Sequence, residues 1–280
     1  AERQVYDEVT SYITKRYEEL EDEKPGKGFV MTVYRRRASS SFFALERSLS
    51  RRREQLQRVA SSRAFDRDMS NQDTPESLPD EDMPDDRPEG RIATAIPEDA
   101  RTASREMAEV DSLLSQIKGL RGQDTKRDRF FDVLRQITDD GRPVLVFTEY
   151  TDTMEYLREY LRDHFGKGLG CYSGDGGRRW TGAEWQAVTK DQITRALRQG
   201  ELRALICTDA ASEGLNLQAA GALINYDLPW SPSRVEQRIG RIDRIGQKHA
   251  DVKIVNLYLK NSVDDKVYHA LRERCGLFEQ

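Results

Sequence analysis

Two arginines in the C-terminal third of the chain, Arg241 and Arg244, have the type and spacing to act on an anion. Residues three apart project from the same face of a helix, and Gln237, four residues before Arg241, joins that face. Two adjacent guanidiniums suit a dense anion such as the γ-phosphate of a nucleotide. An arginine placed there speeds phosphoryl transfer by roughly 10³ to 10⁵. Taken alone, the segment also fits a solvated basic face that binds nothing.

The elements that would position these arginines alternate between strand and helix. Apolar runs predict strands at 143–147, 168–172, 203–207, 222–226 and 252–259. Amphipathic spacing predicts helices after residue 122, at 184–198, from Ser233 and at 263–274, and one that Asp152 caps with Glu155 in a capping box. This alternation predicts an α/β fold, a doubly wound parallel sheet with helices on both faces. Ligands of such folds gather at the carboxyl ends of the strands.

Polar residues follow three of the predicted strands: Thr148, Ser173 and the pair Thr208-Asp209. Hydroxyl groups at these positions suit hydrogen bonds to phosphate, which position a nucleic-acid strand without reading its sequence. Serine and threonine also cap helices routinely, so a structural role stays open for each.

The N-terminal part has a different character. Helical spacing at 4–20 and 29–62 predicts two helices, and the second stretch carries two basic clusters. These clusters suit a phosphate-tracking face or a plain solvated helix surface, and they consist of Arg35, Arg36, Arg37, Arg51, Arg52 and Arg53.

An acidic segment follows. Between residues 73 and 90 there are eight acids, one base and four prolines. Such a composition buries too little apolar surface to offset the entropy of ordering. It predicts a disordered acidic linker at 64–100, between a helical region at 1–63 and a lobe at 101–280.

The bulk composition narrows the classes of protein. The net charge is −4, which does not favour nucleic-acid binding by the chain as a whole, so local patches must decide it. No apolar run is long enough for a membrane span. The three cysteines and three histidines show no metal-ligand spacing. We therefore expect a cytoplasmic protein with reduced thiols, no metal site of its own and no membrane partner.

Three long blocks carry a family resemblance: residues 207–220, 225–232 and 234–247. The first and last resemble motifs five and six of the superfamily-two helicases, in the form used by Swi/Snf-type DNA translocases. Within that family, the three blocks are similar to the sequences of a bacterial branch, which includes the RNA-polymerase-associated ATPase. The resemblance implies a RecA-like second helicase lobe, preceded by a helical protrusion, in a bacterial or archaeal protein of the nucleoid.

The resemblance also implies roles for single residues. Arg241 and Arg244 would be arginine fingers that reach ATP across a cleft. Gly214 and Gln237 would face the nucleotide, and Asp209 would couple the nucleotide cleft to the DNA groove. The nucleic-acid backbone would be contacted by Thr148, Ser173 and Thr208.

Two parts of a complete motor are missing from the sequence. There is no Gly-x-x-x-x-Gly-Lys-Ser/Thr loop and no Asp-Glu block to hold Mg²⁺, and phosphoryl transfer needs both. We expect an N-terminal RecA-like lobe of the same protein, upstream of Ala1, to hold most of the ATP and Mg²⁺. The isolated chain would then be inactive, with double-stranded DNA as its partner. An RNA helicase lobe and a non-catalytic binding module remain alternatives.

Overall fold

The computed structural model describes residues 1–23, 31–61, 96–97, 99–120, 122–209, 217–243 and 246–275. The described residues form two compact units. Of the helices in the described ranges, the helical unit contains two in full and most of two others. The sheet lobe contains residues 39–43 and the described residues from Asp124 onward. Most of the predicted acidic linker lies outside the described residues. Within the described ranges, no helix is both long and apolar enough to cross a membrane.

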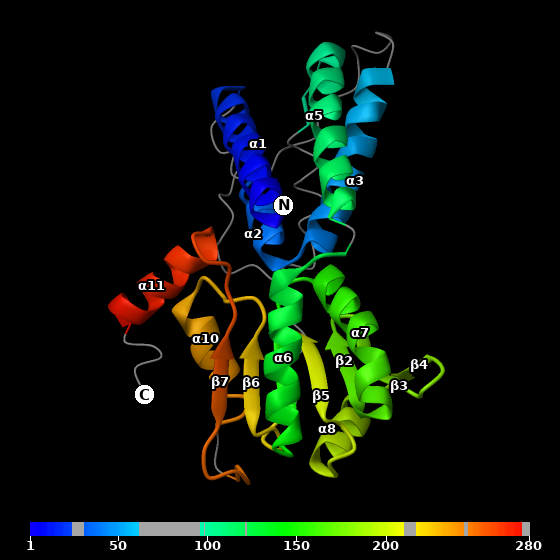
Figure 1. The fold of residues 1–280 in the computed structure, drawn as a ribbon, viewed down its shortest axis with the longest axis vertical. Coiled ribbons are helices and arrows are strands. Elements are labelled where there is room, and N and C mark those ends of the chain that lie inside the picture. The colour runs from blue at the N-terminus through cyan, green and yellow to red at the C-terminus, as the bar shows by residue number, and fades with distance from the viewer. Residues whose placement is uncertain are drawn as a thin grey trace, which may run out of the picture. The chain divides into compact units, whose positions relative to one another are not determined.

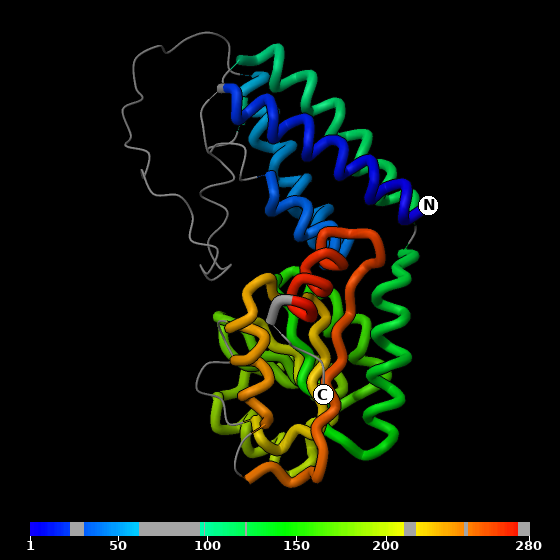
Figure 2. The backbone as a smooth tube through the Cα atoms, turned by 90° about the vertical axis from the view of Figure 1, so that its left-hand side faces the viewer, coloured from blue at the N-terminus to red at the C-terminus, as the bar shows by residue number. Residues whose placement is uncertain are grey.

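The helical unit consists of α1 (Glu2–Glu23), most of α2 (Met31–Ser40) and of α3 (Phe42–Ser61), and all of α5 (Ala100–Gly119). Figure 2 shows α1 and α5 alongside one another, and Lys15 of α1 pairs with Glu109 of α5. The single helix predicted at 29–62 is instead two helices, which break at Ser41. Helix α5 groups with this unit, whereas the predicted boundary at residue 101 places it in the lobe.

The sheet lobe is built on seven strands in the order β4-β3-β2-β5-β1-β6-β7 (Figure 1). Their bounds are β1 Val144–Thr148, β2 Leu169–Ser173, β3 Gly176–Trp180, β4 Trp185–Val188, β5 Ala204–Thr208, β6 Ala222–Asn225 and β7 Lys253–Asn256. Strands β2, β5, β1, β6 and β7 run parallel, as predicted. The remaining two form an antiparallel hairpin on β2.

This hairpin corrects the helix predicted at 184–198. Residues 185–188 are strand β4, and the helix α8 (Lys190–Arg198) begins only after Thr189. Thr189 and Gln192 form a capping box that fixes this start. Helix α7 (Thr151–Phe165) also differs from expectation, because its N-cap is Tyr150 and no side chain caps it. Asp152 lies in the first turn instead, where its charge still suits the helix dipole.

Helices cover both faces of the sheet, which confirms the doubly wound fold. On one face, α6 (Thr125–Asp139) and α7 pack on inward side chains such as Val144 and Val146. On the other face, α8 packs on Leu145 and Phe147. The alternation along β1 follows from the two-residue period of a strand. The last helices, α10 (Pro232–Ile239) and α11 (Val263–Cys275), share a small apolar cluster.

Candidate functional site at the strand ends

The carboxyl ends of β1, β5 and β6 meet at one edge of the sheet. Thr148 ends β1 in register with Thr208 of β5, and Phe147 is in register with Asn225 at the end of β6. The chain continues from these strands into Asp209 and Asp227. Parallel strands thus bring together polar groups that are far apart in sequence.

Arg238 of α10 ties two of these strand ends together. Its guanidinium donates to both carboxylate oxygens of Asp209, each at 2.6 Å. It also donates to the side-chain oxygen of Asn225 at 2.8 Å and to the main-chain oxygen of Asp227 at 2.6 Å. The side chain is only 2% exposed and lies over the Phe147 ring. A bidentate pair in such a site is geometrically demanding and holds α10 against the ends of β5 and β6.

The next arginine, Arg241, lies just beyond α10. The helix ends at Ile239 with Gly240 as its C-cap, so Arg241 lies outside the helix that was expected to carry it, and its pairing with Arg244 stays a prediction. Its main-chain N–H donates to the oxygen of Arg238 at 3.1 Å, which places it directly after the buried arginine. The side chain is partly exposed, and the described residues give it no hydrogen bond or ion pair. Gln237 is exposed on α10.

Two predicted residues cannot be placed. Arg244 and Gly214 lie outside the described residues, so the arginine-finger role of one and the nucleotide contact of the other stay predictions. Asp209, predicted to couple the cleft to the DNA groove, is held by Arg238.

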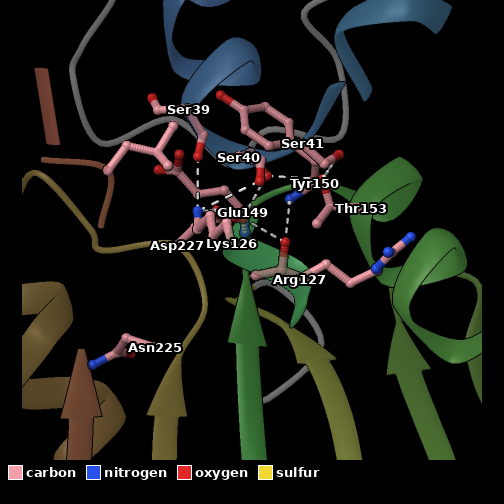
Figure 3. Close-up of polar contacts among 12 residues, drawn as sticks. Ser39, Ser40, Ser41, Lys126, Arg127, Glu149, Tyr150, Thr153, Asn225 and Asp227 are labelled. Atoms are coloured by element: carbon pink, nitrogen blue, oxygen red, sulfur yellow. Dashed lines mark hydrogen bonds and ion pairs between the residues drawn. The ribbon is translucent and has the colours of Figure 1, made fainter. Parts of the chain in front are cut away.

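A second polar cluster surrounds Asp227. The ammonium of Lys126 lies 3.1 Å from Asp227 Oδ1, and the hydroxyls of Ser40 and Thr148 donate to Oδ2 at 2.8 and 2.5 Å. The main-chain N–H of Glu149 donates to the same oxygen at 3.0 Å. Figure 3 shows these groups converging from α6, from the end of β1 and from the short segment 39–41.

The charge on Asp227 is stabilised by these partners. Burial alone would raise the pKa of its carboxyl, but the Lys126 ammonium and three hydrogen-bond donors outweigh burial and lower the pKa. Lys126 also donates to the main-chain oxygen of Ser39 at 2.7 Å and lies 4.4 Å from the centre of the Tyr226 ring. Thr153 of α7 completes the cluster, with its hydroxyl 2.8 Å from that of Ser40 and 2.9 Å from that of Ser41. The cluster therefore anchors segment 39–43 to the strand ends.

Thr148, Ser173 and Thr208, which are expected to contact a nucleic-acid backbone, lie inside the lobe, and that contact stays a prediction. Their side chains are buried, at 0%, 5% and 3% exposure. The Thr148 hydroxyl is engaged by Asp227, and Ser173 accepts from the N–H of Asp175 at 3.3 Å. The Thr208 hydroxyl is buried with no hydrogen-bond partner in the described part of the chain. None of the three presents a hydroxyl to a phosphate at the surface of this structure.

The basic clusters also prove to be partly internal. Arg52 is 0% exposed, and its Nε donates to Glu106 of α5 at 2.5 Å and to the Tyr12 hydroxyl of α1 at 2.9 Å. Arg37 is buried and donates to Ser48 at 2.8 Å. Buried guanidiniums have no surface to offer a DNA backbone, so these two arginines hold helices together instead.

The other members of the clusters are partly exposed. Arg35 donates to Thr14 at 3.1 Å, and Arg53 pairs with Asp111 of α5. Arg36 and Arg51 share this partial exposure. A DNA contact by these four arginines stays a prediction.

Neither cluster at the strand ends has the character of a metal site. The described residues include no group of three or more histidine, cysteine, aspartate or glutamate side chains arranged to hold a metal ion. The carboxylates of Asp209 and Asp227 are already satisfied by Arg238 and Lys126. Arg241, by contrast, is partly exposed.

The sequence of this chain is similar to those of known helicases. Residues 126–246 match the family model of the helicase conserved C-terminal domain. Over 158 residues the chain is 39% identical to a protein of Bacillus subtilis (strain 168) described as the uncharacterized ATP-dependent helicase YqhH. That alignment covers 56% of this chain and 26% of the relative, so the chain spans about a quarter of its length.

Among solved structures, the C-terminal part of the Fun30 ATPase domain is similar in fold. It aligns with a TM-score of 0.53 at 16% identity, covering 96% of this chain and 84% of that one. The lobe therefore has the RecA-like fold of helicase C-terminal lobes. The span that matches the model of the helicase conserved C-terminal domain, residues 126–246, covers β1, β5, β6 and α10 of this lobe.

Proposed function

We propose that this chain supplies the second motor lobe of an ATP-dependent translocase on double-stranded DNA, of the Swi/Snf type and its bacterial branch. One observation carries the proposal: two neighbouring arginines of the same motif have opposite environments. Arg238 is buried and bidentate on Asp209, whereas Arg241 is partly exposed with its guanidinium unpaired within the described ranges. A rigidly held element that presents one uncommitted arginine suits charge stabilisation on a phosphate.

The chain's own residues would divide the work. Arg241 and Arg244 stabilise the charge that develops on the transferred phosphoryl group. Arg238 and Asp209 act as positioning residues that fix where Arg241 emerges. Gln237 and Gly214 border the nucleotide. When bound, ATP and Mg²⁺ supply the reactive phosphoryl group, and most of their contacts come from an N-terminal RecA-like lobe of the same protein.

The roles of the strand ends shift within this proposal. Because Thr148, Ser173 and Thr208 are buried, the loops that follow them contact the DNA backbone through main-chain and neighbouring groups. The relative from Bacillus subtilis supports a bacterial source, and we place the protein in the cytoplasm, associated with the nucleoid, as part of this proposal.

The proposal is tested in the full-length protein with Arg241→Ala. The variant should lower kcat for DNA-stimulated ATP hydrolysis by about 10³-fold and leave duplex-DNA affinity close to that of the parent. Arg241→Lys should restore little, because an ammonium lacks the planar fork. Arg198→Ala, on the exposed surface of α8, is the matched control and should hydrolyse ATP normally. Lost DNA affinity with hydrolysis retained would reverse the roles given to Arg241.

Two further measurements separate the alternatives. Stimulation by RNA in place of duplex DNA would indicate an RNA helicase lobe. The 280-residue chain alone should hydrolyse no ATP above background. Robust turnover by this chain, blocked by Arg241→Ala, would show that it contains a complete site.

A further inference from the structure

The outer strand of the sheet, β4, has an open edge. It is the last strand in the sheet order, and β3 is its one partner among the described strands. Natural edge strands are usually blunted by lysine, proline or a bulge, because an open edge pairs readily with another chain. The β4 sequence Trp185-Gln186-Ala187-Val188 has neither lysine nor proline, and its register with β3 is unbroken.

The pairing pattern shows which backbone groups face outward. The N–H of Thr181 donates to the oxygen of Glu184 at 3.0 Å, so these residues form a hydrogen-bonded pair at the end of the hairpin. Hydrogen-bonded and non-hydrogen-bonded pairs alternate along an antiparallel ladder. Gln186 therefore bonds to β3, while the N–H and C=O of Trp185 and Ala187 point away from it. Within the described ranges no partner meets the outward N–H groups of these two residues.

A basic groove runs beside this edge. It has a volume of about 630 Å³ and lies between the hairpin and α8. Its charged lining residues are Lys167, Arg179, Arg195 and Glu201. Arg179 is paired with Glu201 at 2.9 Å, which leaves the exposed Lys167 and Arg195 as the net charge of the groove. An occupant should therefore be anionic.

We propose that β4 and this groove form a docking site for an extended acidic peptide segment of a partner protein. The segment adds to the sheet as an eighth strand, with its backbone paired to Trp185 and Ala187 and its carboxylates next to Lys167 and Arg195. A site at the hairpin is separate from the strand ends proposed for nucleotide and DNA, so it serves recruitment or regulation.

The backbone groups favour a peptide over a nucleic acid. The open edge presents alternating N–H donors and C=O acceptors. A peptide strand satisfies both, whereas a phosphate backbone accepts hydrogen bonds and donates none. Its approach would leave the carbonyl oxygens of Trp185 and Ala187 without partners. The positive charge of the groove would suit an acidic peptide or a nucleic acid equally. The backbone groups of the open edge favour the peptide.

The test uses the 280-residue chain and a fluorescein-labelled heptapeptide, Glu-Thr-Glu-Val-Glu-Thr-Glu. Anisotropy reports binding, and emission from the tryptophans at 180 and 185 reports the site, because both lie at the hairpin. We expect saturable binding with a change in tryptophan emission. The same peptide with lysine in place of each glutamate should bind much more weakly. N-methylation of alternate residues along one edge of the acidic peptide should abolish binding.

Two variants of the chain test the two parts of the site. Ala187→Pro removes an outward N–H that the sheet does not use, so the hairpin should persist while peptide affinity falls about tenfold. Ala187→Ser keeps that N–H and is its control. Arg195→Glu should weaken binding about tenfold and flatten its salt dependence. Arg198→Glu, on the same helix but outside the groove lining, should bind nearly as the parent does.

Three results would overturn the proposal. One is the absence of saturable binding by the acidic peptide. Another is binding that Ala187→Pro leaves unchanged while circular dichroism and the melting temperature show an intact fold. The third is displacement of the peptide by a short DNA duplex whose own binding needs Arg195 but not the Ala187 N–H. That last result would make the groove a phosphate site.

Discussion

At the scale of single residues, burial decides what each arginine does. Arg52 and Arg238 are both enclosed, and each forms an ion pair with a carboxylate. Removing one partner of such a pair leaves an uncompensated charge in a low-dielectric interior, which costs far more than losing a surface pair. Arg241, which is partly exposed, is under no such constraint. Structural and chemical arginines are therefore separable by mutation.

The Arg52–Glu106 pair gives the first prediction. Glu106→Gln should lower the free energy of unfolding of the helical unit by about 3 kcal/mol, because Arg52 stays buried without a counter-charge. Glu109→Gln on the same helix is the matched control. Glu109 pairs with Lys15 and Arg16 at a partly exposed position. Solvent screens such pairs, so Glu109→Gln should lower the free energy of unfolding by less than about 1 kcal/mol. Urea unfolding measures both, and equal losses would mean that burial does not set the strength of these pairs.

Asp227 gives a prediction about pH. Its pKa is lowered in the folded protein, so its contribution to stability is complete above the unfolded value and declines as pH falls through the folded value. Asp227→Asn should cost about 3 kcal/mol at neutral pH, because Lys126 loses its carboxylate. The difference in free energy of unfolding between parent and variant should become smaller below about pH 4, which is near the pKa of aspartate in the unfolded chain.

The control for this prediction must allow for a neighbour. Asp264 is buried near Asp227 and behaves in the opposite way, because burial raises the pKa of its carboxyl. The Asp227 carboxylate contributes to that raised pKa, so the comparison of Asp227→Asn with its parent is repeated in an Asp264→Asn background, which removes the titration of Asp264. Asp251→Asn is the surface control: the hydrogen bond from Arg142 also lowers the pKa of the Asp251 carboxyl, but solvent screens this exposed pair, so the free energy of unfolding should change much less with pH. A gap that stays constant from neutral to acid pH would show that ionisation of Asp227 does not stabilise the lobe.

At the scale of elements, the sequence predicts the central strands well and the edge poorly. Apolar runs such as 203–207 mark buried parallel strands directly. The hairpin was missed because Gly176–Trp180 and Trp185–Val188 are short and have no strong apolar alternation. Gly240 is the stop signal that ends α10 before Arg241. Arginine-finger spacing predicted a helix that the structure does not have at Arg241.

The buried arginines had a signal that the sequence reasoning overlooked. Arg52 falls on the apolar stripe of α3, between Leu49 and Leu56, at spacings of three and four residues. Arg238 follows the buried Val235 by three residues and precedes the buried Ile242 by four. A basic residue within an apolar stripe indicates an internal ion pair. The identity of the partner, Glu106 or Asp209, depends on tertiary contacts that periodicity does not contain.

The hairpin gives the prediction at this scale. A Cβ added at Gly177 would lie 2.9 Å from the main-chain oxygen of Val188 and 3.1 Å from a side-chain carbon of Ile193. Since the first atom belongs to the β3–β4 ladder, Gly177→Ala should destabilise the lobe by about 2 kcal/mol. Gly168→Ala is the control, because its Cβ would meet only the Arg203 side chain at ordinary contact distance. Equal melting temperatures for the two variants would contradict this account of β3.

At the scale of the whole molecule, the two units have separate interiors. The core of the helical unit includes Val9, Leu45 and Val110, and the sheet lobe has apolar clusters on both faces of its sheet. Each unit also has its own buried ion pair, Arg52–Glu106 in one and Lys126–Asp227 in the other. Segment 39–43 contains the end of α2 and the start of α3 but belongs to the lobe.

This division predicts two thermal transitions, because units with separate cores unfold as separate cooperative blocks. In scanning calorimetry, Glu106→Gln should lower one transition and Asp227→Asn the other. Ser40→Ala should lower the same transition as Asp227→Asn, because the Ser40 hydroxyl donates to Asp227. We expect this although Ser40 ends α2, most of which belongs to the helical unit. A single transition that all three variants lower together would mean that the chain unfolds as one block. If Ser40→Ala lowered only the transition that Glu106→Gln lowers, segment 39–43 would belong energetically to the helical unit.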